Sequence, residues 1–269
     1  MLSESKPFKT VYSAAGSPYA LIPMIMIAAA LNEELKTGMG LCRDRKKIQG
    51  PGLNLWQAAR GDYVICFLRT GVGPRRSAAT LREALKVVKP YSVMVVGYAG
   101  AIDPGLKLGD MVVVARASAF SLDKNRPDWK HVRLEGTYNL SYCETLASSA
   151  KSAGLNVYTG DTLTSSFVLG QPEHKKILFE KFHASIVDME TASIARVAKE
   201  NSIPIGCVRV VSDEAEDSFL APFSYDPLTG ISARAKSLFD KGMMHIYREW
   251  KEHAAVAKAN LHRFLLHYL

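Results

Sequence analysis

The chain lacks the features that mark secreted, disulfide-stapled or disordered proteins. Its four cysteines, at positions 42, 66, 143 and 207, lie far apart and form no C-x-x-C pair. A disulfide framework or a zinc site is therefore not expected, and a reducing compartment fits best. With 48% hydrophobic and 22% charged residues, the composition is typical of a globular protein and gives no support to disorder.

Long apolar runs and a secretion signal are also missing. The run from Leu21 to Leu31 is too short to cross a bilayer. Residues 1–20 hold no apolar core followed by a small-residue cleavage site. We therefore predict a cytoplasmic protein with an N-terminal extension at 1–20 and a single domain at 21–269 that ends in a long helix.

Positive charge is in excess, with a formal net charge of +8 and a sequence pI near 9.2. Basic residues cluster at two places, Arg43–Lys47 and Arg75–Arg76. Neither cluster carries the interleaved aromatic residues of a nucleic-acid stacking platform. We expect a solvated basic face rather than a polyanion site, and no nucleic-acid partner.

Short apolar runs alternate with helical patterns along the chain. This alternation predicts an α/β domain of three layers, αβα, with a mixed, mostly parallel central sheet. Strands are expected at 21–31, 63–71, 92–103, 111–120, 156–168, 185–187 and 203–213, and helices at 74–88, 139–153, 172–182 and 190–201. The polar segment 125–135 and the proline-bearing segment 218–232 are expected to be loops within the same domain.

The C-terminal stretch predicts an amphipathic helix. Its apolar residues recur at steps of four and three: Met243, Tyr247, Trp250, Ala254, Ala257, Leu261 and Phe264. We expect this stripe to pack on its own domain or on a twin subunit. A membrane-surface helix is the alternative, because the basic residues lie largely off the stripe.

Charged residues stand where three of the expected strands end, which is where ligands bind in open α/β sheets. Glu33 and Glu34 follow the first strand, Asp188 and Glu190 flank a strand-to-helix junction, and Asp213 follows a strand that carries Arg209. Each taken alone has a simpler explanation as a helix-end residue or cap. Gly71 and Gly73 lack the third glycine of a dinucleotide fingerprint.

Taken together and in this order, these motifs resemble the nucleoside phosphorylase and nucleosidase superfamily. The likeness is greatest to its methylthioadenosine/S-adenosylhomocysteine nucleosidase branch. It is carried by LNEEL at 31–35, TGVGPRRSAATL at 70–81, VVGYAGAIDPGLKLGDMVVV at 95–114, TGDTLTSSF at 159–167, VDMETASIA at 187–195 and VRVVSDEAED at 208–217. The resemblance implies the fold of that superfamily and a homodimer or higher even oligomer, for which the C-terminal stripe supplies a surface.

The resemblance also implies how an N-glycosidic bond would break. As the bond breaks, positive charge develops on the sugar and negative charge on the base. Asp213 would therefore protonate the leaving purine at N7. Glu34 would take a proton from the attacking water, and Arg209 would orient that water or a carboxylate. Glu190 would hold the ribose hydroxyls, with Met189 against the sugar face.

The remaining expectations concern the base and its acid. Either Phe167 or Leu163 would flank the base. Further substrate-binding positions implied by the motifs are Asp188, Tyr98, Ala99, Gly100 and Ser212, and Tyr98 replaces a serine of the family, which changes or blocks the place beside the nucleophile. The pKa of Asp213 must be raised, and burial together with repulsion from Glu214, Glu216 and Asp217 would achieve this.

Water is the expected acceptor. The phosphate-binding G-D-P-x-R segment of bacterial phosphorylases is missing, Val95 stands where they carry an arginine, and Glu34 would repel phosphate. The predicted reaction is hydrolysis of a purine nucleoside, a 5′-substituted adenosine, without cofactor or metal. Phosphorolysis, with Arg75, Arg76 and Gly73 as anion ligands, is the alternative, and a non-catalytic nucleoside-binding protein is a third.

Overall fold

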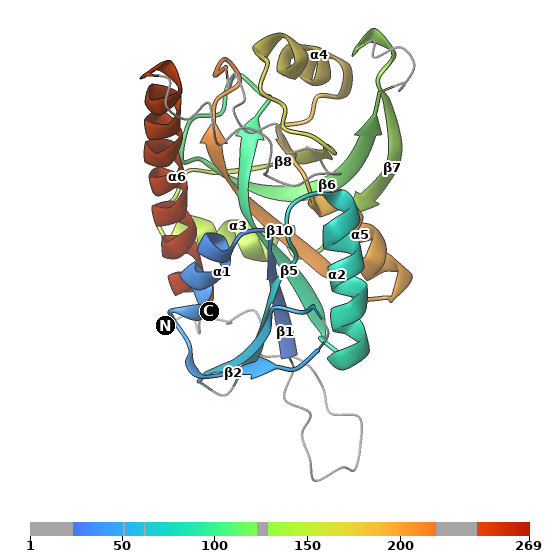
Figure 1. Ribbon diagram of the computed structural model, residues 1–269, viewed down its shortest axis with the longest axis vertical. Helices are drawn as coiled ribbons and strands as arrows, with labels where there is room; N and C mark the ends of the chain where they lie inside the picture. Colours follow the sequence, from blue (N-terminus) through green and yellow to red (C-terminus); the bar gives the residue numbers. More distant parts are fainter. Residues whose placement is uncertain (1–23, 51, 62, 123–128, 219–240) are drawn as a thin grey trace.

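The computed structural model describes residues 24–50, 52–61, 63–122, 129–218 and 241–269. They form three layers, in which helices cover both faces of one large sheet (Figure 1). The αβα prediction is therefore confirmed. The expected extension at 1–20, nearly all of the expected loop at 218–232 and part of that at 125–135 lie outside the described residues.

Parallel strands form the centre of the sheet. β5 (Ser92–Ala101) lies between β1 (Met24–Ala29) and β10 (Ile205–Asp213) and pairs in parallel with both, and β1 pairs in parallel with β4 (Tyr63–Arg69). Their Val-, Ile- and Ala-rich sequences are buried on both faces, as expected for central parallel strands. Because these strands run in the same direction, their carboxyl ends meet at one edge.

The sheet closes on itself beside this edge. β6 (Met111–Ser121) pairs antiparallel with β10 and with β7 (Arg133–Asn139), and in parallel with β8 (Val157–Thr164). β9 (Ile186–Asp188) then links β8 to the end of β5. The closed path β10–β6–β8–β9–β5–β10 brings the end of β9 beside the ends of β5 and β10.

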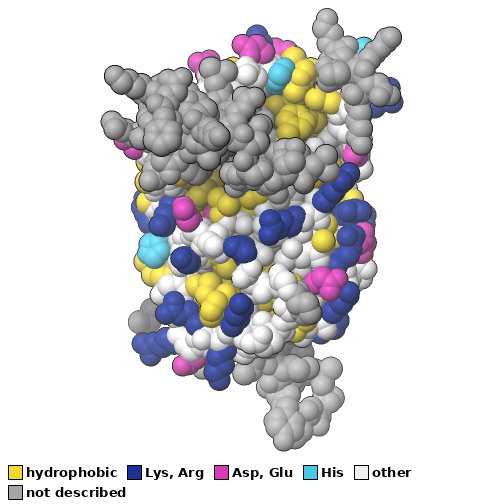
Figure 2. Space-filling view, in the orientation of Figure 1, with side chains coloured by type: hydrophobic (Ala, Val, Ile, Leu, Met, Phe, Trp, Pro, Cys, Tyr) yellow, Lys and Arg dark blue, Asp and Glu magenta, His cyan; other side chains and the backbone are white. Residues whose placement is uncertain are grey.

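Two strands at the other margin were not predicted. β2 (Arg43–Ile48) and β3 (Leu55–Arg60) extend the sheet antiparallel beyond β4. The β2 sequence RDRKKI shows no apolar alternation because it is an exposed edge strand, and charged residues are common on such edges. The basic cluster therefore lies at a sheet margin, and lysine and arginine side chains are scattered over one face of the molecule (Figure 2).

Helices cover both faces of the sheet, and the buried apolar residues form three clusters. α2 (Pro74–Val87) and α5 (Thr191–Glu200) contact each other on one face of the sheet, whereas α1 (Asn32–Met39), α3 (Cys143–Ser152) and α6 (Lys241–Tyr268) pack together on the other. A third apolar cluster lies under α4 (Pro172–Phe182) and the short helix η1 (Trp129–His131). Helix α1, which directly follows β1, was not among the helices expected from the sequence.

The C-terminal stripe is covered by its own domain where its side chains are described. Ala257, Leu261, Phe264 and Leu265 are fully buried in the core cluster that they share with β1, β5 and β10. This half of α6 therefore needs neither a partner subunit nor a membrane to cover it. The side chains of Met243, Tyr247 and Trp250 lie outside the described residues. No helix in the described ranges is long and apolar enough to cross a membrane.

Candidate active site

The junction between β1 and α1 places a buried carboxylate at the edge of the sheet. Glu34 lies in the first turn of α1, where its Oε2 accepts the Leu31 backbone N–H at 2.7 Å. Its Oε1 accepts the Tyr98 N–H at 3.0 Å. Burial raises the pKa of Glu34, and the nearby Arg209 guanidinium opposes that rise. The residue is thus both a helix-start residue and a candidate proton acceptor.

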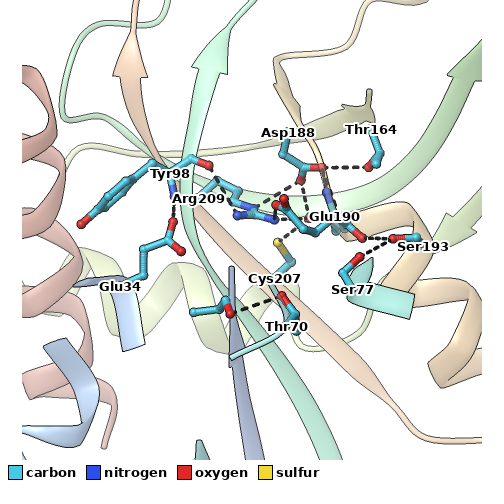
Figure 3. A network of polar contacts seen from close by, with 12 residues as sticks. Glu34, Thr70, Ser77, Tyr98, Thr164, Asp188, Glu190, Ser193, Cys207 and Arg209 are labelled. Carbon is cyan, nitrogen blue, oxygen red and sulfur yellow. Dashed lines mark hydrogen bonds and ion pairs between the residues drawn. The ribbon is translucent and has the colours of Figure 1, made fainter. Parts of the chain in front are cut away.

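A glycine in β5 lets this carboxylate approach an arginine. A Cβ atom built on Gly97 would lie 2.5 Å from Glu34 Oε1 and 2.5 Å from Arg209 Nη1. The next residue, Tyr98, uses its backbone here: its carbonyl accepts Arg209 Nη1 at 3.4 Å. The Tyr98 ring points away from Arg209 and Glu190 and packs among apolar residues (Figure 3). The expectation that Tyr98 changes or blocks the place beside the nucleophile stays a prediction.

Arg209 of β10 is a buried cation of the site, 1% exposed. Its Nη2 donates to Thr191 Oγ1 at 2.9 Å and lies 3.4 Å from Glu190 Oε2, and its Nε lies 3.3 Å from Asp188 Oδ2. Burial acts to lower the Arg209 pKa, but the surrounding carboxylates outweigh burial and raise it. The guanidinium therefore stays charged inside the protein, where it compensates a cluster of acids (Figure 3).

Asp188 ends β9 and is engaged on both carboxylate oxygens. Its Oδ1 accepts Thr164 Oγ1 at 2.8 Å and the backbone amides of Glu190 and Thr191, both at 3.1 Å. Its Oδ2 accepts the Thr191 hydroxyl and pairs with Arg209. Both carboxylate oxygens thus hold Arg209 and the start of α5 in place, and the expected contact of Asp188 with substrate stays a prediction.

Glu190 lies at the start of α5 with an unusual pKa. Burial, opposed by Arg209, raises the pKa of this carboxyl to about 7. Its Oε1 accepts the Gly73 backbone N–H at 3.0 Å. Gly73 was expected as an anion ligand, but its amide is engaged by a carboxylate. Arg75 and Arg76 are exposed at the start of α2, and the Arg76 side chain lies against Gly71.

Asp213 ends β10 and is 9% exposed. Ser212 Oγ donates to its Oδ1 at 2.9 Å, and Gly100 lies so close that a Cβ there would be 2.6 Å from Oδ2. The Ala99 carbonyl oxygen, 3.3 Å from Ser212 Oγ, is an alternative acceptor for the same hydroxyl hydrogen. Burial raises the pKa of Asp213, although Lys175 opposes that rise.

The acidic loop after Asp213 contributes little to the raised pKa of that residue. Glu214 turns its carboxylate away, toward Lys107 Nζ at 2.9 Å and the Leu108 N–H at 3.1 Å. Asp217 raises the Asp213 pKa only weakly, and its carboxylate accepts the Glu214 N–H. Burial is the main cause of the raised pKa of Asp213, whereas the Glu214 carboxylate is paired with Lys107.

Sequence reasoning missed Lys175. This residue of α4 is fully buried, and its Nζ donates to Asp213 Oδ2 at 2.8 Å and to the Glu214 carbonyl at 2.6 Å. The sequence carries no signal for it, because a lysine at 176 stands beside it in the same helix.

Of the two residues expected at the base, Phe167 retains more exposure. Leu163 is 2% exposed within the third apolar cluster. The Phe167 ring lies 6.1 Å from Phe120 and 6.0 Å from Trp129, and it is partly exposed. Met189 is also half-buried. These positions favour Phe167 as the residue beside a base.

The site is therefore built for proton transfer. It combines buried carboxylates of raised pKa with a buried guanidinium, all where strands end, and such perturbed groups concentrate at functional sites. No group of three or more His, Cys, Asp or Glu within the described ranges is arranged to hold a metal ion.

A closed mixed sheet between helical layers, with acids and an arginine at its carboxyl edge, defines an α/β protein of the nucleoside phosphorylase fold. The chain belongs to the Phosphorylase superfamily, whose family model matches residues 25–269. A curated relative, the 5′-methylthioadenosine/S-adenosylhomocysteine nucleosidase of Glaesserella parasuis, is 24% identical over 219 residues, which cover 79% of this chain and 94% of the relative.

Solved structures share the fold. The 5′-methylthioadenosine/S-adenosylhomocysteine nucleosidase of Neisseria meningitidis, in complex with methylthio-immucillin-A, aligns with a TM-score of 0.69 at 17% identity, covering 91% of this chain and 97% of that one. The futalosine hydrolase of Helicobacter pylori aligns with a TM-score of 0.63 at 22% identity, covering 72% of this chain and 89% of that one.

Proposed function

We propose that this protein hydrolyses the N-glycosidic bond of a 5′-substituted adenosine and releases adenine. The observation that carries the proposal is the buried cluster of Glu34, Arg209 and Glu190. Arg209 lies on strand β10, which ends at Asp213. The similar proteins that are named nucleosidases and hydrolases support the same reaction class.

The proposed reaction assigns one role to each acid. As the C1′–N9 bond breaks, its electron pair moves to the purine, and Asp213 gives a proton to N7. Water attacks C1′ and transfers its proton to Glu34. Glu190 binds the ribose hydroxyls, and its interaction strengthens as the sugar gains positive charge. Arg209 keeps Glu34 and Glu190 in place and offsets their charge.

Water is favoured over phosphate by the charges beside the proposed sugar position. Glu34 is a buried carboxylate there, and a carboxylate repels a phosphate dianion. The Gly73 amide, which could have bound an anion, donates to Glu190. Arg75 and Arg76 are exposed on α2. This distribution of charge supports hydrolysis.

Three further parts of the proposal rest on the resemblance or on composition. The 5′ substituent is open between methylthio and a larger or more apolar group, because the chain after Ser218 resembles the nucleosidase branch poorly. The protein forms a homodimer or a higher even oligomer, which sedimentation would test. It works in the cytoplasm, consistent with four unpaired cysteines.

A product assay tests the reaction. The protein is incubated with adenosine, methylthioadenosine, S-adenosylhomocysteine and inosine, with and without phosphate. We expect free adenine and a reducing sugar in phosphate-free buffer. Glu34→Gln should lose most of kcat and little binding, whereas Glu33→Gln, at the exposed neighbouring position, should behave as wild type. Release that requires phosphate and yields ribose 1-phosphate would refute the proposal.

A further inference from the structure

A buried lysine contacts the proposed general acid. Lys175 is fully buried in α4, and it is the only buried lysine in the ranges that the structure describes. Its Nζ lies 2.8 Å from Asp213 Oδ2, 2.6 Å from the Glu214 carbonyl and 3.4 Å from the Asp217 carbonyl. It therefore joins helix α4, the end of β10 and the loop after it.

Burying a lysine side chain is energetically unfavourable unless its ammonium group is paired. Moving an ammonium group out of water costs several kcal/mol unless its donors find acceptors. Three oxygen atoms surround the Lys175 ammonium, which carries three donor hydrogens. Lys176, the next residue, is instead exposed and lies 3.8 Å from Glu180 in a surface ion pair. An apolar residue at 175 would fill the same space without this cost.

We propose that Lys175 is a positioning residue for Asp213, which fixes the carboxyl group toward the purine and stabilises the carboxylate that remains when the proton leaves. This inference rests on the proposed function, in which Asp213 is the general acid. The contact through Oδ2, with Ser212 on Oδ1, determines the plane of the carboxyl group.

The proton balance of the step is simple. The proton on Asp213 passes to N7 while the electron pair of the breaking C1′–N9 bond moves to the purine. The purine therefore leaves as a neutral molecule protonated at N7, and the carboxyl group of Asp213 becomes a carboxylate. Lys175 is neither the donor nor the acceptor of the transferred proton. A cation at hydrogen-bond distance favours the charged form of the carboxyl group, so it makes Asp213 a stronger acid in a buried site.

A pH dependence follows. Among the residues that the structure describes, the charged groups that act on Asp213 are Lys175 from α4 and Asp217 from the following loop, while the Glu214 carboxylate turns to Lys107. Without Lys175, burial and Asp217 would act on the Asp213 pKa without the opposing charge of this lysine and would raise the pKa further. Because the reaction needs protonated Asp213, the alkaline limb of the rate profile should then move to higher pH.

The test compares Lys175→Met with Lys176→Met, its exposed neighbour. We measure kcat and KM for adenine release between pH 5 and pH 10. For Lys175→Met we expect kcat to fall at least about tenfold and the alkaline limb to rise by about 1 to 3 pH units. Lys176→Met should match wild type. An unchanged pH profile in Lys175→Met would show a merely structural role and overturn the proposal.

A second measurement does not depend on activity. Unfolding by urea is compared for Lys175→Met, Asp213→Asn and the double variant. If the two residues form a coupled pair, the double variant is more stable than the sum of the single losses predicts. Additive losses would overturn the inference. A wild-type protein that releases no base would refute the proposed function, while this cycle would still decide whether Lys175 and Asp213 are coupled.

Discussion

Replacing Glu190 by glutamine should stabilise the fold above neutral pH. Glu190 is 4% exposed, and burial, opposed by its ion pair with Arg209, raises its pKa from 4.5 to about 7. Between those two pH values the folded protein keeps a proton that the unfolded chain has lost. Its contribution to stability is therefore complete below pH 4.5 and is lost as the pH rises through about 7.

The size of the effect follows from the two pKa values. A difference of about 2.5 pKa units corresponds to about 3 kcal/mol of unfolding free energy, at about 1.4 kcal/mol per unit. Glutamine has the shape of the protonated acid and can still accept the Gly73 N–H. We therefore expect Glu190→Gln to be more stable than wild type by up to about 3 kcal/mol at pH 8, and to equal it near pH 4.5.

Urea unfolding at pH 4.5, 6 and 8 would measure this difference. Glu200→Gln is the matched control, because Glu200 ends the same helix and is exposed in an ion pair with Arg82. The control should show no pH-dependent gain. If Glu190→Gln were equally destabilised at all three pH values, the burial cost assigned to this carboxylate would be wrong. The same variant should bind nucleoside weakly, because it loses the charge that holds the ribose hydroxyls.

Two further changes test the geometry of the site and of the core. Gly97→Ala places a methyl group 2.5 Å from both Glu34 and Arg209. We expect kcat/KM to fall at least about a hundredfold, because small displacements of reacting groups strongly slow the reaction. Wild-type kinetics would refute this expectation. Phe264→Ala should lower the unfolding free energy by about 3 to 5 kcal/mol, because the ring is fully buried within its own chain. Calorimetry would measure that loss, and a loss below about 1 kcal/mol would contradict the packing of α6.

The sequence by itself determined the helices other than α1, most strands and the order of the charged motifs. These features depend on local chemistry: α2 shows its 3.6-residue period, and the parallel strands β1, β5 and β10 show continuous apolar runs. The positions of Glu34, Glu190 and Asp213 at strand ends followed from the same patterns, because the carboxyl ends of parallel strands share one edge.

Other features were decided only by the tertiary structure. β2 and β7 have mostly exposed side chains, so their sequences show no alternation of apolar and polar residues. They are strands because β3 and β6 supply their backbone hydrogen bonds, which the sequence does not reveal. The direction of the Tyr98 ring depends on the apolar cluster beside α6, which is distant in sequence. Lys175 and Lys176 are identical neighbours in one helix, and only the docking of α4 against the end of β10 buries the first and leaves the second in water.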